Sequence, residues 1–67
     1  MEITYRVPGM HCDGCRRAVE HEVSQVEGVS SVDVSLRSKL VTVTGEDLSD
    51  EALRSAIDEA GYDAEAA

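Results

Sequence analysis

The chain has 67 residues, of which 42% are apolar, and it contains two tyrosines but no phenylalanine or tryptophan. A chain this short lies near the lower size limit for an unaided hydrophobic core, which excludes a second domain and leaves too little core for a deep substrate pocket. Fourteen acidic and six basic side chains give a net charge of −8, which excludes the basic face that nucleic acids need and disfavours docking on anionic lipid.

The sequence shows neither a membrane span nor a signal peptide. No apolar run approaches the roughly 20 residues that a membrane helix needs. The first residues pass directly into an alternating pattern, instead of a basic region followed by an apolar block. We therefore expect one domain over residues 1–67, located in the cytoplasm, without membrane insertion and without enzymatic activity.

Residues 2–7 form the first predicted element. Apolar and polar side chains alternate there, with Ile3, Tyr5 and Val7 on the apolar side. Alternation of this kind is typical of a half-buried strand. A proline–glycine pair then ends the strand, because proline cannot continue a ladder and glycine permits a turn.

A helix is predicted over residues 14–26. Asp13 is a suitable N-cap for it, and Gly28 is a suitable stop. Apolar side chains recur between them at helical spacing. This stripe consists of Cys15, Ala18, Val19, Val23 and Val26.

A hairpin is predicted next. Residues 29–36 and residues 40–44 both alternate, and the polar residues 37–39 lie between them. Two strands joined by a three-residue turn pair as an antiparallel hairpin. In the second strand we expect Val41 and Val43 to face the core.

The last part of the chain predicts a second helix and a short strand. Ser49 is the expected N-cap, and Asp50 and Glu51 suit the positive end of a helix dipole. Gly61 is the expected stop, and residues 62–66 alternate weakly, as a short strand would. The apolar stripe of this helix consists of Leu53, Ala56, Ile57 and Ala60.

The predicted order of elements is therefore β-α-β-β-α-β. Right-handed crossovers place both helices on the same face of the sheet. The expected fold is a ferredoxin-like α/β sandwich, in which a four-stranded antiparallel sheet carries two helices on one face.

The two cysteines of the chain, Cys12 and Cys15, lie where the first helix is expected to begin. In a reducing compartment a Cys-x-x-Cys pair is more often a metal or redox site than a structural disulfide. The positive end of the helix dipole stabilises thiolates. Arg16 and Arg17 add positive charge nearby, and Asp13 removes some, so we expect two thiolates near neutral pH.

Two thiolates with few other ligands favour a soft ion such as Cu(I), because structural zinc takes four ligands. An ion held by two sulfurs at an exposed end of the fold remains open to a third ligand, which an acceptor's cysteine can supply. The competing interpretations are a thiol–disulfide enzyme and a pair of structural cysteines. Thioredoxin-like sites usually have an aromatic residue before the first cysteine and a proline between the two, and this chain has neither.

The segment Gly-Met-His-Cys-Asp-Gly-Cys at residues 9–15, together with Gly28-Val29 and Gly61-Tyr62, resembles the heavy-metal-associated domain family. Members of this family include small cytoplasmic copper chaperones and the N-terminal domains of copper-exporting P-type ATPases. The resemblance covers nearly the whole chain. It implies that Cys12 and Cys15 bind Cu(I).

The resemblance also implies roles for the neighbours of the two cysteines. Met10 is expected to be a buried anchor for the loop and not a ligand. Tyr62 matches an aromatic residue that bacterial members place near the metal loop, where its hydroxyl shields or hydrogen-bonds a thiolate, or where the ring simply packs. His11 departs from the Thr or Ser of many copper-binding members. It is either a third ligand for copper or zinc, a bridge in a dimer, or a residue that points to solvent.

Divalent-metal members of the family often carry an acidic residue directly before the first cysteine, and this chain does not, which favours Cu(I) over Zn(II). The function implied is a metallochaperone that passes Cu(I) by thiolate exchange to a copper-transporting P-type ATPase or to a copper regulator, as a monomer or a metal-bridged dimer. The alternatives are an N-terminal regulatory domain of a copper ATPase and a Zn(II)- or Hg(II)-binding member.

Eight of the fourteen acidic residues lie within residues 46–65, where Arg54 is the one basic residue. This acidic stretch is either a solvated face or a surface that steers the protein towards a partner of complementary charge.

Overall fold

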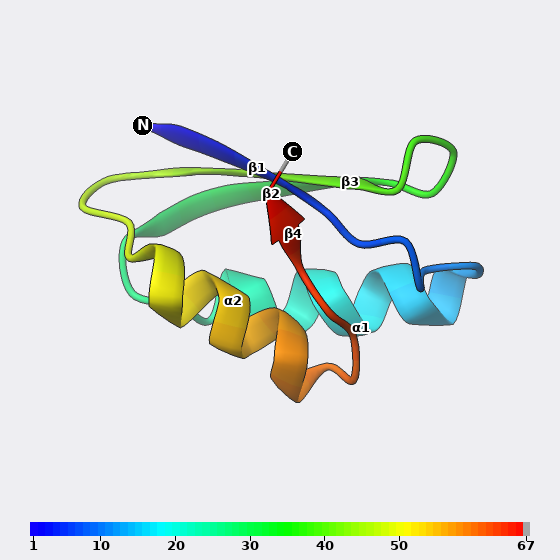
Figure 1. The fold of residues 1–67 in the computed structure, drawn as a ribbon. Coiled ribbons are helices and arrows are strands. Elements are labelled where there is room, and N and C mark those ends of the chain that lie inside the picture. The colour runs from blue at the N-terminus through cyan, green and yellow to red at the C-terminus, as the bar shows by residue number, and fades with distance from the viewer. Residues whose placement is uncertain (67) are drawn as a thin grey trace.

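The computed structural model describes residues 1–66, which form an antiparallel sheet with two helices against one of its faces (Figure 1). The predicted ferredoxin-like fold is confirmed, and the predicted domain end at Ala67 lies outside the described residues. None of the helices in the described part is long and apolar enough to cross a membrane. In chain order the elements are β1 (Glu2–Arg6), α1 (Asp13–Ser24), β2 (Val29–Ser35), β3 (Leu40–Gly45), α2 (Asp50–Glu59) and β4 (Glu65–Ala66).

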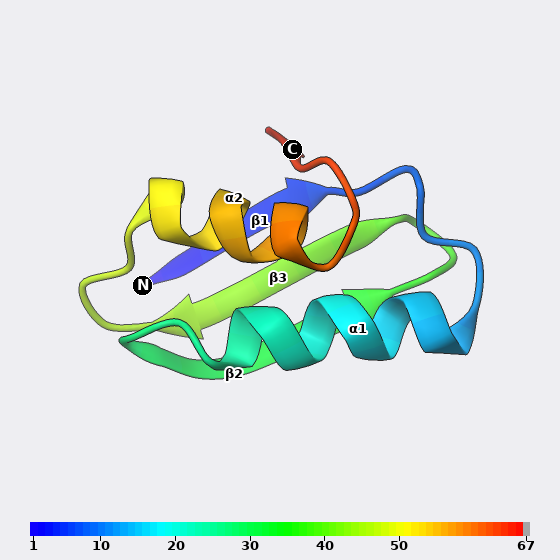
Figure 2. The ribbon, with the colours of Figure 1, turned by 90° about the horizontal axis from the view of Figure 1, so that it is seen from below.

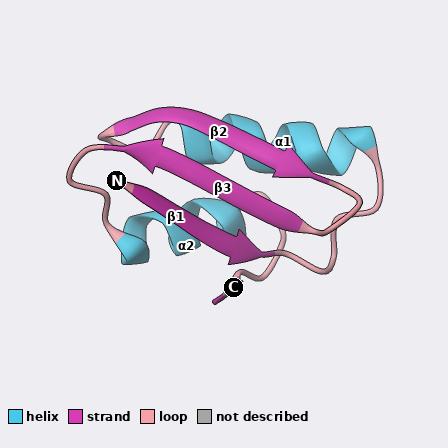
Figure 3. Ribbon diagram, turned by 90° about the horizontal axis from the view of Figure 1, so that it is seen from above, coloured by secondary structure: helices cyan, strands magenta, loops and turns pink. Residues whose placement is uncertain are grey.

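The strands lie in the order β2-β3-β1-β4, and each neighbouring pair is antiparallel (Figure 3). Val41 of β3 lies opposite Tyr5 on one side and opposite Val34 on the other. β4 is shorter than the predicted strand over residues 62–66, because Tyr62 and Ala64 pack against the core while the chain returns from α2 to the sheet.

Both helices begin with a cap and end in a tight turn. The predicted cap of α2 is confirmed, because the Ser49 hydroxyl accepts a hydrogen bond from the Ala52 N–H at 3.3 Å. α1 ends at Ser24, two residues earlier than predicted. The N–H groups of Gln25 and Val26 bond to carbonyls three residues back, which tightens the chain out of the α-helix.

The core lies between the sheet and the two helices, which run side by side beneath it (Figure 2). Val41 and Val43 are fully buried, as the alternation of β3 predicts. The fully buried side chains are Tyr5, Val7, Met10, Val19, Val23, Val41, Val43, Leu53 and Ile57.

Three connections meet at one end of the sandwich. These are the segment from β1 to α1, the turn between β2 and β3, and the segment after α2 (Figures 1 and 2). The Val7 N–H bonds to the Lys39 carbonyl at 2.7 Å, which joins the first two connections. The fold therefore places both cysteines at the end where the turn and the C-terminal segment can contact them.

Candidate metal site

Cys12 is the N-cap of α1. Its backbone is extended, with φ −145° and ψ 168°, and its sulfur accepts a hydrogen bond from the Cys15 N–H at 3.3 Å. The prediction that Asp13 caps the helix is wrong by one residue, because the Cys12 sulfur takes the place that a capping oxygen usually fills. Asp13 is instead the first helical residue, and its carboxylate lies 3.7 Å from Arg16.

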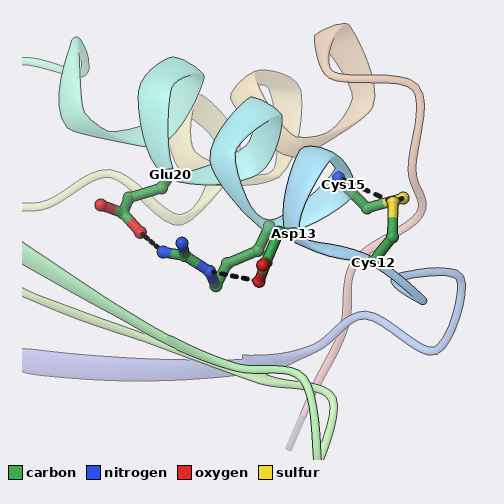
Figure 4. A network of polar contacts seen from close by, with 5 residues as sticks. Cys12, Asp13, Cys15 and Glu20 are labelled. Carbon is green, nitrogen blue, oxygen red and sulfur yellow. Dashed lines mark hydrogen bonds and ion pairs between the residues drawn. The ribbon is translucent and has the colours of Figure 1, made fainter.

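The two cysteines bring their sulfur atoms together at the start of α1, as Figure 4 shows. The Sγ atoms are 2.8 Å apart, well beyond a disulfide bond of about 2.05 Å, and both residues are free cysteines. Cys12 is exposed and Cys15 is half-buried. The pair is therefore open to solvent on the Cys12 side and supported by the helix on the Cys15 side.

The surroundings of Cys15 favour its thiolate. The pKa of Cys15 is lowered to about 6, mainly by the hydrogen bond with Cys12, and then by the Tyr62 hydroxyl and the backbone N–H of His11. From the sequence, we expected Arg16 and Arg17 to contribute to the low pKa. The Arg16 guanidinium is instead engaged with Glu20 at 2.8 Å, so short-range hydrogen bonds account for the low pKa.

Tyr62 lies against the loop that carries the cysteines. A Cβ atom built on Gly9 would come within 3.2 Å of Cδ1 of the Tyr62 ring, so the ring covers this part of the loop. The contact with Cys15 raises the pKa of Tyr62, because the phenol donates to the sulfur in its neutral form. The ring of Tyr62 therefore lies against the loop, and its hydroxyl affects the pKa of Cys15.

Met10 and His11 lie on opposite sides of the loop surface. The Met10 side chain is fully buried in the core, and the His11 side chain is exposed. Among residues 1–66, no group of three or more His, Cys, Asp or Glu side chains is placed to hold a metal. His21 is exposed on α1, with its Nε2 atom 2.7 Å from the Gln25 amide nitrogen.

Lys39 is the residue of this site that the sequence did not reveal. Its ammonium group donates a hydrogen bond to the Met10 carbonyl, across 29 positions of sequence. The sequence shows Lys39 as part of a polar turn, and no local pattern indicates which loop it contacts. The antiparallel order of the strands, which brings the turn beside the loop, is the signal from which this contact could have been inferred.

The chemistry of the site follows from its donors. Two sulfur atoms, one of them with a low pKa and the other exposed, offer soft anionic ligands at the surface. The pair lies at the positive end of α1, where an anionic ligand is favoured. The arrangement can bind a soft metal ion and leave one side of that ion accessible.

The comparisons with known proteins point to metal binding. A family model described as the heavy-metal-associated domain matches residues 4–63. Copper chaperone CopZ from Staphylococcus saprophyticus is 40% identical over 62 residues, which cover 90% of this chain and 91% of that protein. The periplasmic component of a mercuric transport protein from Salmonella typhi is 42% identical over 62 residues, which cover 90% of this chain and 68% of that protein.

One relative is much longer than this chain. Heavy metal-associated isoprenylated plant protein 24 from Arabidopsis thaliana is 46% identical over 43 residues, which are 64% of this chain and 29% of that protein. The module therefore occurs both nearly alone and as a part of larger proteins.

Solved structures share the fold along nearly the whole chain. The CopZ metallochaperone matches with a TM-score of 0.91 at 33% identity and covers 96% of this chain and 98% of its own. A copper binding domain from a P-type ATPase matches with a TM-score of 0.92 at 29% identity and covers 98% of this chain and 92% of its own.

Proposed function

The chain belongs to the heavy-metal-associated domain family, and on this premise we propose that it carries Cu(I) on Cys12 and Cys15 and passes it to an acceptor by thiolate exchange. The carrier role, in place of catalysis, accords with the metal-carrying proteins among its relatives. Met10 and Tyr62 support the site without binding the ion.

The observation that carries the proposal is the pair of free thiols at the start of α1, with sulfur atoms 2.8 Å apart. Two soft thiolates suit Cu(I), whereas structural zinc is held by four ligands. In the part of the chain that the structure describes, no third side chain completes a zinc-like group. The donor set therefore favours a soft ion with few ligands.

Uptake of the ion requires the two sulfurs to separate. Metal–sulfur bonds of about 2.3 Å, the length seen for zinc, place two sulfurs in line about 4.6 Å apart. Cys12 is exposed and precedes the first helical residue, whereas Cys15 lies within α1 and contacts Tyr62. We expect the Cys12 side chain to rotate outward while Cys15 stays in place.

Release follows the same route in reverse. A thiolate of the acceptor attacks the exposed side of the ion, and the ion keeps at least two sulfur ligands throughout, so it never enters water. The acceptor we propose is the metal-binding domain of a copper-transporting P-type ATPase, or a copper regulator. Docking should be weak and transient, because the cargo must leave.

The similarity to a mercuric transport protein makes Hg(II), another soft ion, the second candidate for the cargo. A Zn(II)-binding role requires further ligands, of which His11 is the nearest in sequence. The likeness to a copper binding domain of a P-type ATPase supports the alternative that the same module is a regulatory domain of a transporter.

Anaerobic titration of the reduced protein with Cu(I), in competition with a chromophoric chelator, tests the proposal. We expect one tightly bound ion per monomer, or ions shared within a dimer that sedimentation would detect. The Cys12→Ser, Cys15→Ser double variant should lose this binding, and His21→Ala, which removes an exposed histidine far along α1, is the control. Tight Cu(I) binding by the double variant would refute the proposed site.

Two further measurements separate the alternatives. Competition with Hg(II) and Zn(II) identifies the cargo, and a Cu(I) complex readily displaced by Zn(II) would contradict the copper assignment. His11→Ala should bind Cu(I) as the wild type does, because its side chain is exposed and outside any preformed ligand group. A loss of affinity in His11→Ala but not in His21→Ala would make His11 a third ligand.

A further inference from the structure

Lys39 holds both ends of the short segment that leads from β1 to the cysteines. Its carbonyl accepts the Val7 N–H at 2.7 Å, and its ammonium group donates to the Met10 carbonyl. The side chain is half-buried, so the contact with Met10 is partly shielded from water. One residue of the β2–β3 turn therefore fixes the path of the chain immediately before His11 and Cys12.

The Met10 carbonyl and the His11 N–H belong to the same peptide group. A trans peptide is planar, so these two groups point in opposite directions, and fixing one fixes the other. The Met10 side chain is fully buried, which anchors this peptide from a second direction. The Met10 N–H also donates to the Val7 carbonyl at 3.3 Å, so this short segment is closed by its own backbone and held to the turn by Lys39.

We propose that Lys39 is a positioning residue of the metal site, whose ammonium group fixes the orientation of the Met10–His11 peptide and so the start of the segment that carries Cys12. The metal-binding part of this inference rests on the proposed function, and the positioning part does not.

The backbone conformation of Lys39 offers a variant that distinguishes positioning of the site from a purely structural role in the turn. Lys39 has φ 62°, which lies in the left-handed region that glycine adopts without strain. Lys39→Gly therefore removes the backbone strain at this position of the turn and, at the same time, removes the ammonium group. If Lys39 served only to build the turn, its replacement by glycine would not weaken Cu(I) binding.

The test compares four variants of the full chain, reduced and metal-free, with the wild type. Lys39→Met and Lys39→Gly remove the donor, Lys39→Arg keeps a donor, and Arg37→Met removes an exposed cation from the same turn as the matched control. For each variant we measure exchange of the Met10 amide proton, which bonds to the Val7 carbonyl, with water by NMR, the thermal midpoint, and the Cu(I) affinity by chelator competition.

We expect faster exchange of the Met10 amide in Lys39→Met and Lys39→Gly, because the segment loses its clamp, and a loss of Cu(I) affinity of about tenfold, as for other residues that orient metal ligands. Lys39→Arg should restore both properties, and Arg37→Met should leave them unchanged. The thermal midpoint of Lys39→Gly should equal or exceed that of Lys39→Met, although both variants show faster amide exchange and weaker Cu(I) binding.

Unchanged exchange of the Met10 amide in both Lys39→Met and Lys39→Gly would overturn the proposal, even if the thermal midpoint fell. An equal loss of affinity in Arg37→Met would also overturn it, since charge in the turn would then be the cause. If the wild type does not bind Cu(I), the proposed function fails, and the exchange measurement on the metal-free protein still decides the role of Lys39.

Discussion

Cys12 combines two tasks at one sulfur atom. It caps α1 by accepting the Cys15 N–H at 3.3 Å, and it is a proposed ligand of the ion. Serine is among the best N-cap residues and alanine among the poorest, and neither provides a soft ligand. Substitutions at this position can therefore separate the capping of the helix from the binding of the metal.

Cys12→Ser and Cys12→Ala should both lose tight Cu(I) binding but differ in stability. We expect the metal-free Cys12→Ala protein to have a free energy of unfolding about 1 kcal/mol below that of Cys12→Ser, because it lacks a capping acceptor. For a chain of this size the difference corresponds to a thermal midpoint lower by about 4–8 °C. Equal midpoints would show that the cap hydrogen bond contributes nothing to stability.

The low pKa of Cys15 has a consequence for the metal-free protein. The pKa is about 6, whereas an ordinary cysteine has a pKa of about 8.5. Because the folded state favours the thiolate, this contribution to stability is fully present above the ordinary pKa and is lost as the pH falls through about 6. Stability should therefore rise between pH 6 and 8.5 relative to a Cys15→Ser variant.

Tyr62→Phe tests the hydroxyl group that contributes to this shift. We expect the pKa of Cys15 to rise in the variant, since a donor to the thiolate is removed while the ring still covers the loop. Thiolate absorbance at 240 nm as a function of pH measures the midpoint directly, and Tyr5→Phe is the control because its hydroxyl bonds to Asp50. A midpoint that stays near 6 in Tyr62→Phe would mean that Tyr62 acts by packing alone.

At the scale of the elements, two glycines end the helices in the same conformation but in different surroundings. Gly28 has φ 91° and Gly61 has φ 94°, so a side chain is strained at either position. A Cβ atom on Gly28 would lie 2.2 Å from the Glu46 carbonyl oxygen, whereas none of the atoms described lies within 4 Å of a Cβ on Gly61. Gly28 also lies where the start of β2 and the end of β3 come close together, because its carbonyl accepts the Glu46 N–H at 2.9 Å.

Gly28→Ala and Gly61→Ala therefore form a matched pair. Gly61→Ala should lower the free energy of unfolding by about 1–2 kcal/mol, the cost of the left-handed conformation alone. Gly28→Ala should cost clearly more, because the clash with a backbone carbonyl cannot be relieved by a side-chain rotation. Chemical denaturation of the two variants measures the difference, and equal losses would show that the β2–β3 edge can move apart at little cost.

The elements could be predicted from the sequence because each is encoded locally. Alternation in β3 and the Ser49 cap of α2 both lie within a few residues of the structure that they determine. The start of α1 was misplaced because cysteine is not an expected N-cap. The Cys12–Cys15 pair is also local, whereas the contacts of Tyr62 with Gly9 and of Lys39 with Met10 join distant segments and depend on the order of the strands.

At the scale of the whole molecule, the net charge of −8 produces repulsion that the fold does not neutralise. Arg54 is the one basic residue within positions 46–65, and its guanidinium is occupied by Asp50 at 3.0 Å and lies over the Tyr5 ring. α2 has acidic residues in its first turn and no basic residue in its last turn. The acids at its C-terminal end thus add an unfavourable interaction with the helix dipole to the general repulsion.

Glu51→Gln and Glu59→Gln separate these two effects, because both remove one negative charge, from opposite ends of α2. General repulsion falls equally in the two variants, whereas the dipole favours a carboxylate at position 51 and disfavours one at position 59. We expect Glu59→Gln to have a thermal midpoint about 4 °C above that of Glu51→Gln at low salt. Calorimetry at increasing NaCl should show the gap closing, because salt screens exposed charges. If both variants gain the same stability, the net charge alone governs it, and a gap that persists in high salt would point to a packing difference instead.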